Sequence, residues 1–208
     1  MTEEAITLHY IDAALLVVEK AAGLLSVPGR LPENRDCLVT RLQALYPGAL
    51  TVHRLDQVTS GLMLYARGAP AQAALSAQFR ERGVHKRYEA VVEGLLEADA
   101  GEIDLPLICD WPNRPRQRVD AVHGKPSLTR WRVRERDAAG LRTRVALEPV
   151  TGRSHQLRVH LASLGHPIVG DVFYGAQASS RVHLHACELG FAHPATGAPL
   201  RFRSPAPF

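Results

Sequence analysis

Cysteine and lysine are both scarce in this sequence, and each shortage narrows what the protein can be. The three cysteines, Cys37, Cys109 and Cys187, lie far apart and match neither a CxxC pair nor a zinc-ligand spacing. We therefore expect reduced thiols rather than disulfides or a zinc module. Lysine occurs three times against 22 arginines. Codon bias explains such a ratio as well as function does, so only the local placing of the arginines indicates a partner.

The sequence also lacks several known motifs, and their absence argues against secreted, membrane, nucleotide-binding and metalloprotease classes. No cationic, apolar and small-residue series of a signal peptide opens the chain, and no apolar run approaches the roughly 20 residues that span a bilayer. Neither a Gly-rich nucleotide loop nor an HExxH pattern occurs. We therefore expect a soluble, cytoplasmic protein without a membrane partner, cofactor or metal.

The composition is that of an ordinary globular protein with a basic surface. The chain has 208 residues, of which 46% are hydrophobic and 22% are charged, enough for one sizeable core. Its net charge is +4 and its pI is about 9.2, which favours an anionic partner without identifying one.

Hydrophobic periodicity predicts more strands than helices. Spacings of three and four between apolar residues predict three helices. The first has Asp36 as N-cap and stops at Pro47, the second carries the apolar stripe Ala71, Leu75 and Phe79 and ends near Gly83, and the third covers His155–Leu164. Apolar runs and alternating patterns predict seven strands, several of which follow one another without a helix between them. These strands are expected at 15–18, 62–66, 86–94, 128–135, 142–148, 182–189 and 200–205. The pattern predicts an α+β fold around a mixed, mostly antiparallel sheet.

The segment HRLDQVTSGLMLYAR, from His53 to Arg67, places Arg54 and Asp56 two residues apart just before a core strand. This pattern is typical either of a surface turn with a local ion pair or of a catalytic carboxylate positioned by the turn. Leu55 would anchor the turn in the core, so that Arg54 and Asp56 address the same partner. His53 is a candidate for orienting this loop through a hydrogen bond.

Two further segments carry arginines in suggestive places. In GRSHQLRVHLASLGHP, Ser154 is the expected cap of an amphipathic helix with a leucine stripe. Arg153 precedes that helix, and Arg158 and His155 lie off the stripe, where they suit an anionic partner or simply solvent. In LPLICDWPNRPRQRVDAVHGK, Trp111 accompanies three alternating arginines, which could follow a phosphate backbone or form a solvated loop. These are Arg114, Arg116 and Arg118.

Together, in this order, the motifs resemble those of the RluA family of pseudouridine synthases, which isomerise uridine in structured RNA. The resemblance begins at LLVVEKAAGLLSVPG and includes HRLDQVTSGLMLYAR, KRYEAVV and GRSHQLRVHLASLGHPIVGD. The segment DLPLICDWPNRP is similar to a dual-specificity branch that modifies an anticodon-loop uridine of tRNA and a hairpin of large-subunit ribosomal RNA. Lys20-Ala21-Ala22-Gly23 departs from the family's usual K-P-x-G.

The resemblance implies specific roles and partners. Asp56 would be the essential aspartate, Tyr88 the active-site tyrosine, and Arg153 the arginine that pairs with Asp56. The whole chain, 1–208, would be one catalytic domain without the S4-type RNA-binding domain of many relatives. It would act as a monomer on tRNA, large-subunit rRNA or both. RNA contacts would then come from the catalytic domain itself, through His53, Arg54, Arg114, Arg116, Arg118 and Arg158.

The chemistry of the reaction agrees with these residues independently of the family. Isomerisation breaks an N-glycosidic bond and forms a carbon–carbon bond, which needs one ionised carboxylate but neither redox change nor group transfer. The target base must leave its stack, and Arg54 is a candidate for filling the vacated space. Two alternatives were considered. A non-catalytic RNA-binding module would have lost the Asp, Tyr or Arg of the centre, and a metal-dependent hydrolase would show clustered acidic and histidine ligands. His155, His160, His183 and His185 instead suggest structural histidines.

Overall fold

The computed structural model describes residues 6–29 and 31–208, which divide into two compact units. Of these residues, the first unit comprises 6–29, 31–86 and Ala186–Pro207, and the second Arg87–His185 with Phe208. Two strands, β5 (His85–Glu93) and β11 (Leu184–Ala192), run from one unit into the other. The prediction of a single domain over residues 1–208 stays a prediction, and the two units are described separately.

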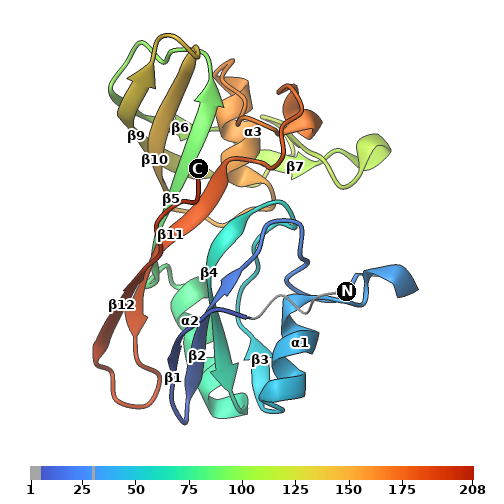
Figure 1. The fold of residues 1–208 in the computed structure, drawn as a ribbon, viewed down its shortest axis with the longest axis vertical. Helices are drawn as coiled ribbons and strands as arrows, with labels where there is room; N and C mark the ends of the chain where they lie inside the picture. Colours follow the sequence, from blue (N-terminus) through green and yellow to red (C-terminus); the bar gives the residue numbers. More distant parts are fainter. Residues whose placement is uncertain (1–5, 30) are drawn as a thin grey trace. The chain divides into compact units, whose positions relative to one another are not determined.

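The first unit is a sheet with helices (Figure 1). Its strand order is β1-β2-β4-β11, with β3 paired to β4 and β12 paired to β11. The pairs β1–β2, β2–β4, β3–β4 and β11–β12 are antiparallel. The bounds of its other elements are β1 (Leu8–Ile11), β2 (Leu15–Lys20), η1 (Pro32–Asn34), α1 (Leu38–Leu45), β3 (Ala49–Thr51), β4 (Ser60–Arg67), α2 (Ala69–Arg80) and β12 (Pro199–Arg203).

Strands β2 and β4 are apolar without alternation because both of their faces are covered. Leu15 and Val17 face a core cluster that also contains Leu75 of α2, whereas the neighbouring Leu16 and Val18 point to the opposite face. All four β2 side chains are fully buried. These central strands were predicted from their apolar runs, and the structure confirms them.

Gly61 marks a point of close backbone approach in β4. Its φ of +115° is in the region that favours glycine, and a Cβ there would lie 2.4 Å from the carbonyl oxygen of Ala186 in β11. The glycine that follows the HRLD segment is therefore needed for packing β4 against β11.

The second unit is an antiparallel sheet of order β5-β10-β9-β6, with a separate two-stranded sheet, β7–β8. Helix α3 contacts β8, β9 and β10 (Figure 1). The bounds are β6 (Ala100–Asp104), β7 (Leu107–Cys109), η2 (Trp111–Asn113), β8 (Gln117–Val119), β9 (Leu128–Asp137), β10 (Arg142–Pro149), α3 (Gln156–Ser163) and η3 (Val172–Tyr174). Together the two units confirm the predicted α+β class, with mostly antiparallel strands.

Helix α3 is not amphipathic, which corrects the prediction of a leucine stripe opposite a polar face. All six residues from Gln156 to Leu161 are buried, and Leu164 is exposed instead. The buried polar side chains have partners: the Gln156 amide nitrogen donates to Leu128 O and Thr129 Oγ1 at 3.0 Å, and Thr151 donates to its oxygen at 2.7 Å. A polar residue in the sequence did not indicate an exposed position here, because the neighbouring strands supply its hydrogen bonds.

Arg158 and Asp171 form a buried ion pair next to α3. The guanidinium donates from Nε at 2.6 Å and from Nη2 at 2.8 Å to the two carboxylate oxygens, and both side chains are at most 3% exposed. Such a bidentate geometry is the one in which a buried pair is best satisfied.

The helices begin elsewhere than their expected caps. The N-cap of α1 is Cys37, whereas Asp36 pairs with Arg41, and the N-cap of α3 is His155 in a left-handed conformation rather than Ser154. Both cap predictions were wrong. Asp36 lies one residue before the N-cap and binds Arg41, and Ser154 lies one residue before the N-cap of α3.

In the described part of the chain, no helix is long and apolar enough to cross a membrane.

Removing one partner of the buried pair should destabilise the protein strongly. We expect Arg158→Met or Asp171→Leu to lower the free energy of unfolding by about 3–5 kcal/mol, because each leaves one charge buried without this partner. The double variant should be clearly more stable than the sum of the two losses predicts, as measured by urea denaturation. Strictly additive losses would show that the two side chains do not stabilise each other.

Candidate active site

The HRLD segment forms a loop between β3 and β4 of the first unit. Arg54 is exposed, Leu55 is buried, and Asp56 is half-buried. The backbone N–H of Thr59 donates to the carbonyl of Asp56 at 3.1 Å, which closes a tight turn before β4. The prediction that Leu55 anchors this turn in the core is confirmed, while Arg54 and Gln57 are exposed and Asp56 is partly accessible.

Two buried polar side chains fix the main chain on either side of Asp56. Ser26 Oγ donates to the Leu55 carbonyl at 2.7 Å and accepts from the Leu55 N–H at 3.1 Å. On the other side, Lys20 Nζ donates to the carbonyl of Gln57 at 2.9 Å. Both side chains are nearly inaccessible to solvent, so no water competes for these bonds. The carboxylate of Asp56 is thereby carried on a preorganised backbone.

Lys20 also joins this loop to the segment that follows β2. Its ammonium donates to the carbonyls of Ala21 at 2.8 Å and Leu24 at 2.6 Å, and Gly23 N–H donates to Gln57 O at 2.8 Å. No role was predicted for Lys20 or Ser26. A lysine at the end of a strand that begins with four apolar residues was the available signal, since a buried ammonium requires several acceptors.

His53, at the start of the loop, is hydrogen-bonded to the neighbouring strand. Its Nε2 accepts a hydrogen bond from the backbone N–H of Leu64 at 2.9 Å, and its ring stacks on Phe79 with centroids 4.5 Å apart. Burial, together with the nearby Lys86 ammonium, lowers the pKa of His53 to about 3, so the imidazole is neutral near pH 7. The bond to Leu64 agrees with an orienting role, which stays a prediction, as does a contact with RNA.

Tyr88 and Arg153 belong to the second unit, so their expected meeting with Asp56 stays a prediction. Tyr88 is half-buried in β5, opposite Leu147 of β10. Arg153 is exposed at the turn before α3, where its backbone N–H donates to Gln156 Oε1 at 3.0 Å and its Nε donates to Pro126 O at 3.3 Å. The turn is thus ordered by the buried Gln156, and it presents an accessible guanidinium.

Arg158, expected on the helix face toward RNA, is buried instead. Its guanidinium is clamped by Asp171 and lies 5.1 Å from the ring centre of Tyr174. His155, also expected off the stripe, is half-buried, with Nδ1 2.6 Å from the Tyr174 hydroxyl. We therefore correct the assignment of Arg158 as a surface RNA contact, because burial removes it from the reach of an exposed phosphate.

The three arginines around β7 and β8 differ from one another. Arg114 lies 4.3 Å above the ring of Trp111, and that indole is 65% exposed. Arg116 lies 5.7 Å from the ring of Phe173, whereas Arg118 is paired with Asp120 at 2.8 Å. Arg114 and Trp111 thus form an exposed cation–π pair, while the charge of Arg118 is already balanced by a carboxylate.

The histidines of the described residues do not form a metal-ligand cluster. Within 6–29 and 31–208, no three His, Cys, Asp or Glu side chains come together as ligands. His160, one of the histidines expected to be structural, places Nδ1 2.9 Å from Thr129 Oγ1 and Nε2 3.0 Å from Leu105 O. Burial lowers the pKa of His160, consistent with a neutral side chain in a hydrogen-bonded core position.

The low pKa of His53 makes stability depend on pH in a defined direction. Between about pH 3 and 6.5 the unfolded chain binds a proton at this residue and the folded chain does not, so unfolding becomes easier as the pH falls. We expect His53→Gln, which retains an acceptor for Leu64 N–H, to weaken this dependence by at most about 1.4 kcal/mol per pH unit. Urea denaturation of both proteins from pH 7 to pH 4 measures the difference. Parallel stability curves would refute the assignment.

Comparison with known proteins agrees with these motifs. Residues 14–163 match the model of a family described as RNA pseudouridylate synthase. Proteins named dual-specificity RNA pseudouridine synthase RluA are similar over most of their length. The one from Yersinia pestis is 52% identical, covering 96% of this chain and 98% of the relative, and the one from Escherichia coli K12 is 49% identical, covering 99% and 95%.

Solved structures give the same result. Human RNA pseudouridylate synthase domain containing 1 superimposes with a TM-score of 0.82 at 32% identity, covering 99% of this chain and 85% of that one. Human RNA pseudouridylate synthase domain containing 4 has a TM-score of 0.78 at 25% identity, with 97% and 88% covered. Sequence motifs, fold and relatives agree, and the chain belongs to the RNA pseudouridylate synthase family.

Proposed function

We propose that this protein isomerises specific uridines to pseudouridine in a tRNA anticodon stem-loop and in a hairpin of large-subunit ribosomal RNA, with Asp56 as the catalytic carboxylate. The observation that carries the proposal is the loop of Asp56, whose backbone is held on both sides by Ser26 and Lys20. The bacterial relatives named as dual-specificity enzymes support both substrates. The protein would act as a monomer in the cytoplasm, where both RNAs are found.

The proposed reaction needs little beyond a well-placed carboxylate. An ionised Asp56 would act as nucleophile or base on a uridine taken out of its stack, and the freed base would be rejoined through carbon. A rigid loop favours this step because the acid does not have to be ordered during the reaction. The product is an isomer of the substrate, so the reaction needs no cofactor to supply or accept atoms or electrons.

Two residues of the second unit complete the proposed centre. Tyr88 would stack on the uracil and take up the proton from C5 at the end of the reaction. Arg153 would pair with Asp56 and stabilise its charge once RNA excludes water, because an adjacent guanidinium offsets the cost of burying a carboxylate. The exposed position of Arg153 supports this role, since the guanidinium is accessible at an ordered turn.

RNA would be held by exposed arginines with aromatic neighbours. The Arg114–Trp111 pair offers both a cation for phosphate and a flat surface for a base, a combination typical of proteins that bind single-stranded RNA segments. Arg116 would contribute in the same way through Phe173. Arg118 would contribute less, because Asp120 competes for its charge.

Loss of the Asp56 carboxylate should abolish catalysis without unfolding the protein. We expect Asp56→Asn, with the same size and a neutral amide, to release no tritium above background from tRNA labelled at uracil C5, whereas the wild type releases it without added metal or nucleotide. Arg153→Ala should lower the rate by orders of magnitude, because the carboxylate loses its proposed partner.

A matched control separates these effects from folding. Arg80 is an exposed arginine of α2, 3.8 Å from Glu81, and Arg80→Ala should leave tritium release unchanged. Equal release by the wild type and Asp56→Asn would remove Asp56 from the mechanism. A wild type that binds RNA tightly yet releases no label would instead indicate a non-catalytic RNA-binding module.

Arg54 is proposed to fill the space that the target base leaves. Arg54→Ala should therefore impair a structured stem-loop by at least about tenfold more than a short RNA whose target base is already unstacked, because flipping costs a few kcal/mol only in the first. Tritium release rates on both substrates provide the comparison. The same loss on both RNAs would mean that Arg54 binds RNA without assisting flipping.

A further inference from the structure

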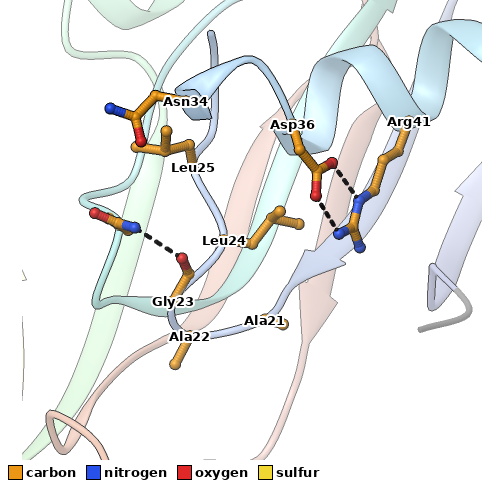
Figure 2. Close-up of a pocket in the computed structure, with 9 residues that line it drawn as sticks. Ala21, Ala22, Gly23, Leu24, Leu25, Asn34, Asp36 and Arg41 are labelled. Atoms are coloured by element: carbon orange, nitrogen blue, oxygen red, sulfur yellow. Dashed lines mark hydrogen bonds and ion pairs between the residues drawn. The ribbon is translucent and has the colours of Figure 1, made fainter. Parts of the chain in front are cut away.

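A polar pocket of about 320 Å³ lies in the first unit beside the loop of Asp56 (Figure 2). Three segments form its walls: the turn after β2, the approach to α1 together with one residue of that helix, and Gln57. It contains none of the residues assigned above to catalysis. Its lining residues are Ala21, Ala22, Gly23, Leu24, Leu25, Asn34, Asp36, Arg41 and Gln57.

The pocket is tied directly to the catalytic loop. Gln57 follows Asp56 in the chain, and its amide nitrogen donates to the Gly23 carbonyl at 3.0 Å. Gly23 N–H donates in return to the Gln57 carbonyl at 2.8 Å, and Lys20 Nζ donates to the same carbonyl at 2.9 Å. One lining residue of the pocket is therefore the direct sequence neighbour of Asp56.

One wall presents a planar guanidinium in a fixed orientation, paired with a carboxylate. Arg41 donates from Nε at 2.8 Å and from Nη2 at 2.7 Å to the two oxygens of Asp36, so its guanidinium plane is set by two parallel bonds (Figure 2). Those bonds lower the pKa of Asp36, which keeps the carboxylate charged and the clamp closed at neutral pH. An oriented guanidinium plane is a favourable stacking surface for a nucleobase.

The remaining lining suits a base better than a phosphate. Leu24 and the methyl groups of Ala21 and Ala22 provide apolar contacts, and the Gln57 and Asn34 amides provide donors and acceptors that can read a base edge. The Asp36 carboxylate beside Arg41 disfavours a phosphate, because it would repel a second anion. The volume falls within the range of pockets that enclose small organic ligands.

We propose that this pocket binds the base of an unpaired nucleotide that neighbours the target uridine in the same RNA, with Arg41 as its stacking residue. The inference rests on the proposed function and adds a specificity site to it. Binding one neighbouring base would draw the RNA backbone toward the loop of Asp56 and help to hold the target nucleotide in its everted state.

The test is a double-mutant cycle between protein and RNA. A set of stem-loops is prepared in which each unpaired nucleotide around the target is replaced in turn by an abasic residue, and tritium release is measured as kcat and KM. For the wild type, one abasic position should raise KM about 5- to 30-fold, the loss expected for one stacked base, with little change in kcat. Arg41→Ala should raise KM by a similar factor on the unmodified RNA. For this variant, the abasic substitution at the same position should cause no further increase in KM.

Two further variants make the result specific. Arg41→Lys retains the positive charge but lacks the plane, so it should behave as Arg41→Ala. Arg80→Ala, an exposed arginine beside a carboxylate in α2, should retain the full abasic penalty. Thermal denaturation verifies that each variant is folded, which is expected because both arginine side chains are partly or largely exposed.

The outcomes separate this proposal from the proposed function. Equal abasic penalties in the wild type and Arg41→Ala at every position would overturn the base pocket, while active wild-type enzyme would leave the isomerase function standing. The base pocket would also be overturned if Arg41→Lys had the same KM as the wild type while Arg41→Ala had a raised KM. The positive charge alone, and not the guanidinium plane, would then be what the RNA recognises. A wild type inactive on every RNA would contradict the proposed function itself.

Discussion

Hydrogen bonds from two buried side chains to the backbone around Asp56 are the constraint on which the conformation of this loop, and with it the proposed catalysis, depends. Ser26 holds Leu55 by both its N–H and its carbonyl, and Lys20 holds Gln57. These bonds are made to the main chain of Leu55 and Gln57, so they fix the position of the Asp56 backbone and not of its side chain. Asp56 is thus carried on a loop whose main chain is ordered when the protein folds.

The second unit uses the same device around α3. Gln156 and His160 bind main-chain and threonine oxygens of neighbouring strands, and Arg158 is clamped by Asp171. A helix whose polar residues all have buried partners cannot rotate without breaking several hydrogen bonds at once. The turn that carries Arg153 is consequently held in one orientation, which is the property that a positioning arginine requires.

Strand patterns were the part of the fold that could be predicted most fully. The apolar runs at β2 and β4 and the alternation at β9 and β10 depend on local chemistry, and the structure confirms all four. Strands β1, β3, β6, β7 and β8 were missed, because all five are only three to five residues long and carry little periodic signal. Strands β1, β3 and β6 pair with the predicted strands β2, β4 and β9, whereas β7 and β8 pair with each other.

The amino-acid sequence by itself determined the family, the chemistry and the candidate acid, because motif order and residue type are written in the chain. Tertiary structure alone decided that His53 is neutral, that Arg158 is buried and that Lys20 holds the loop of Asp56. The physical reason is that charge state and accessibility depend on neighbours brought from distant parts of the sequence. The sequence around Arg158 is the same whether its side chain is exposed to solvent or buried against an aspartate, so only the tertiary contacts distinguish the two cases.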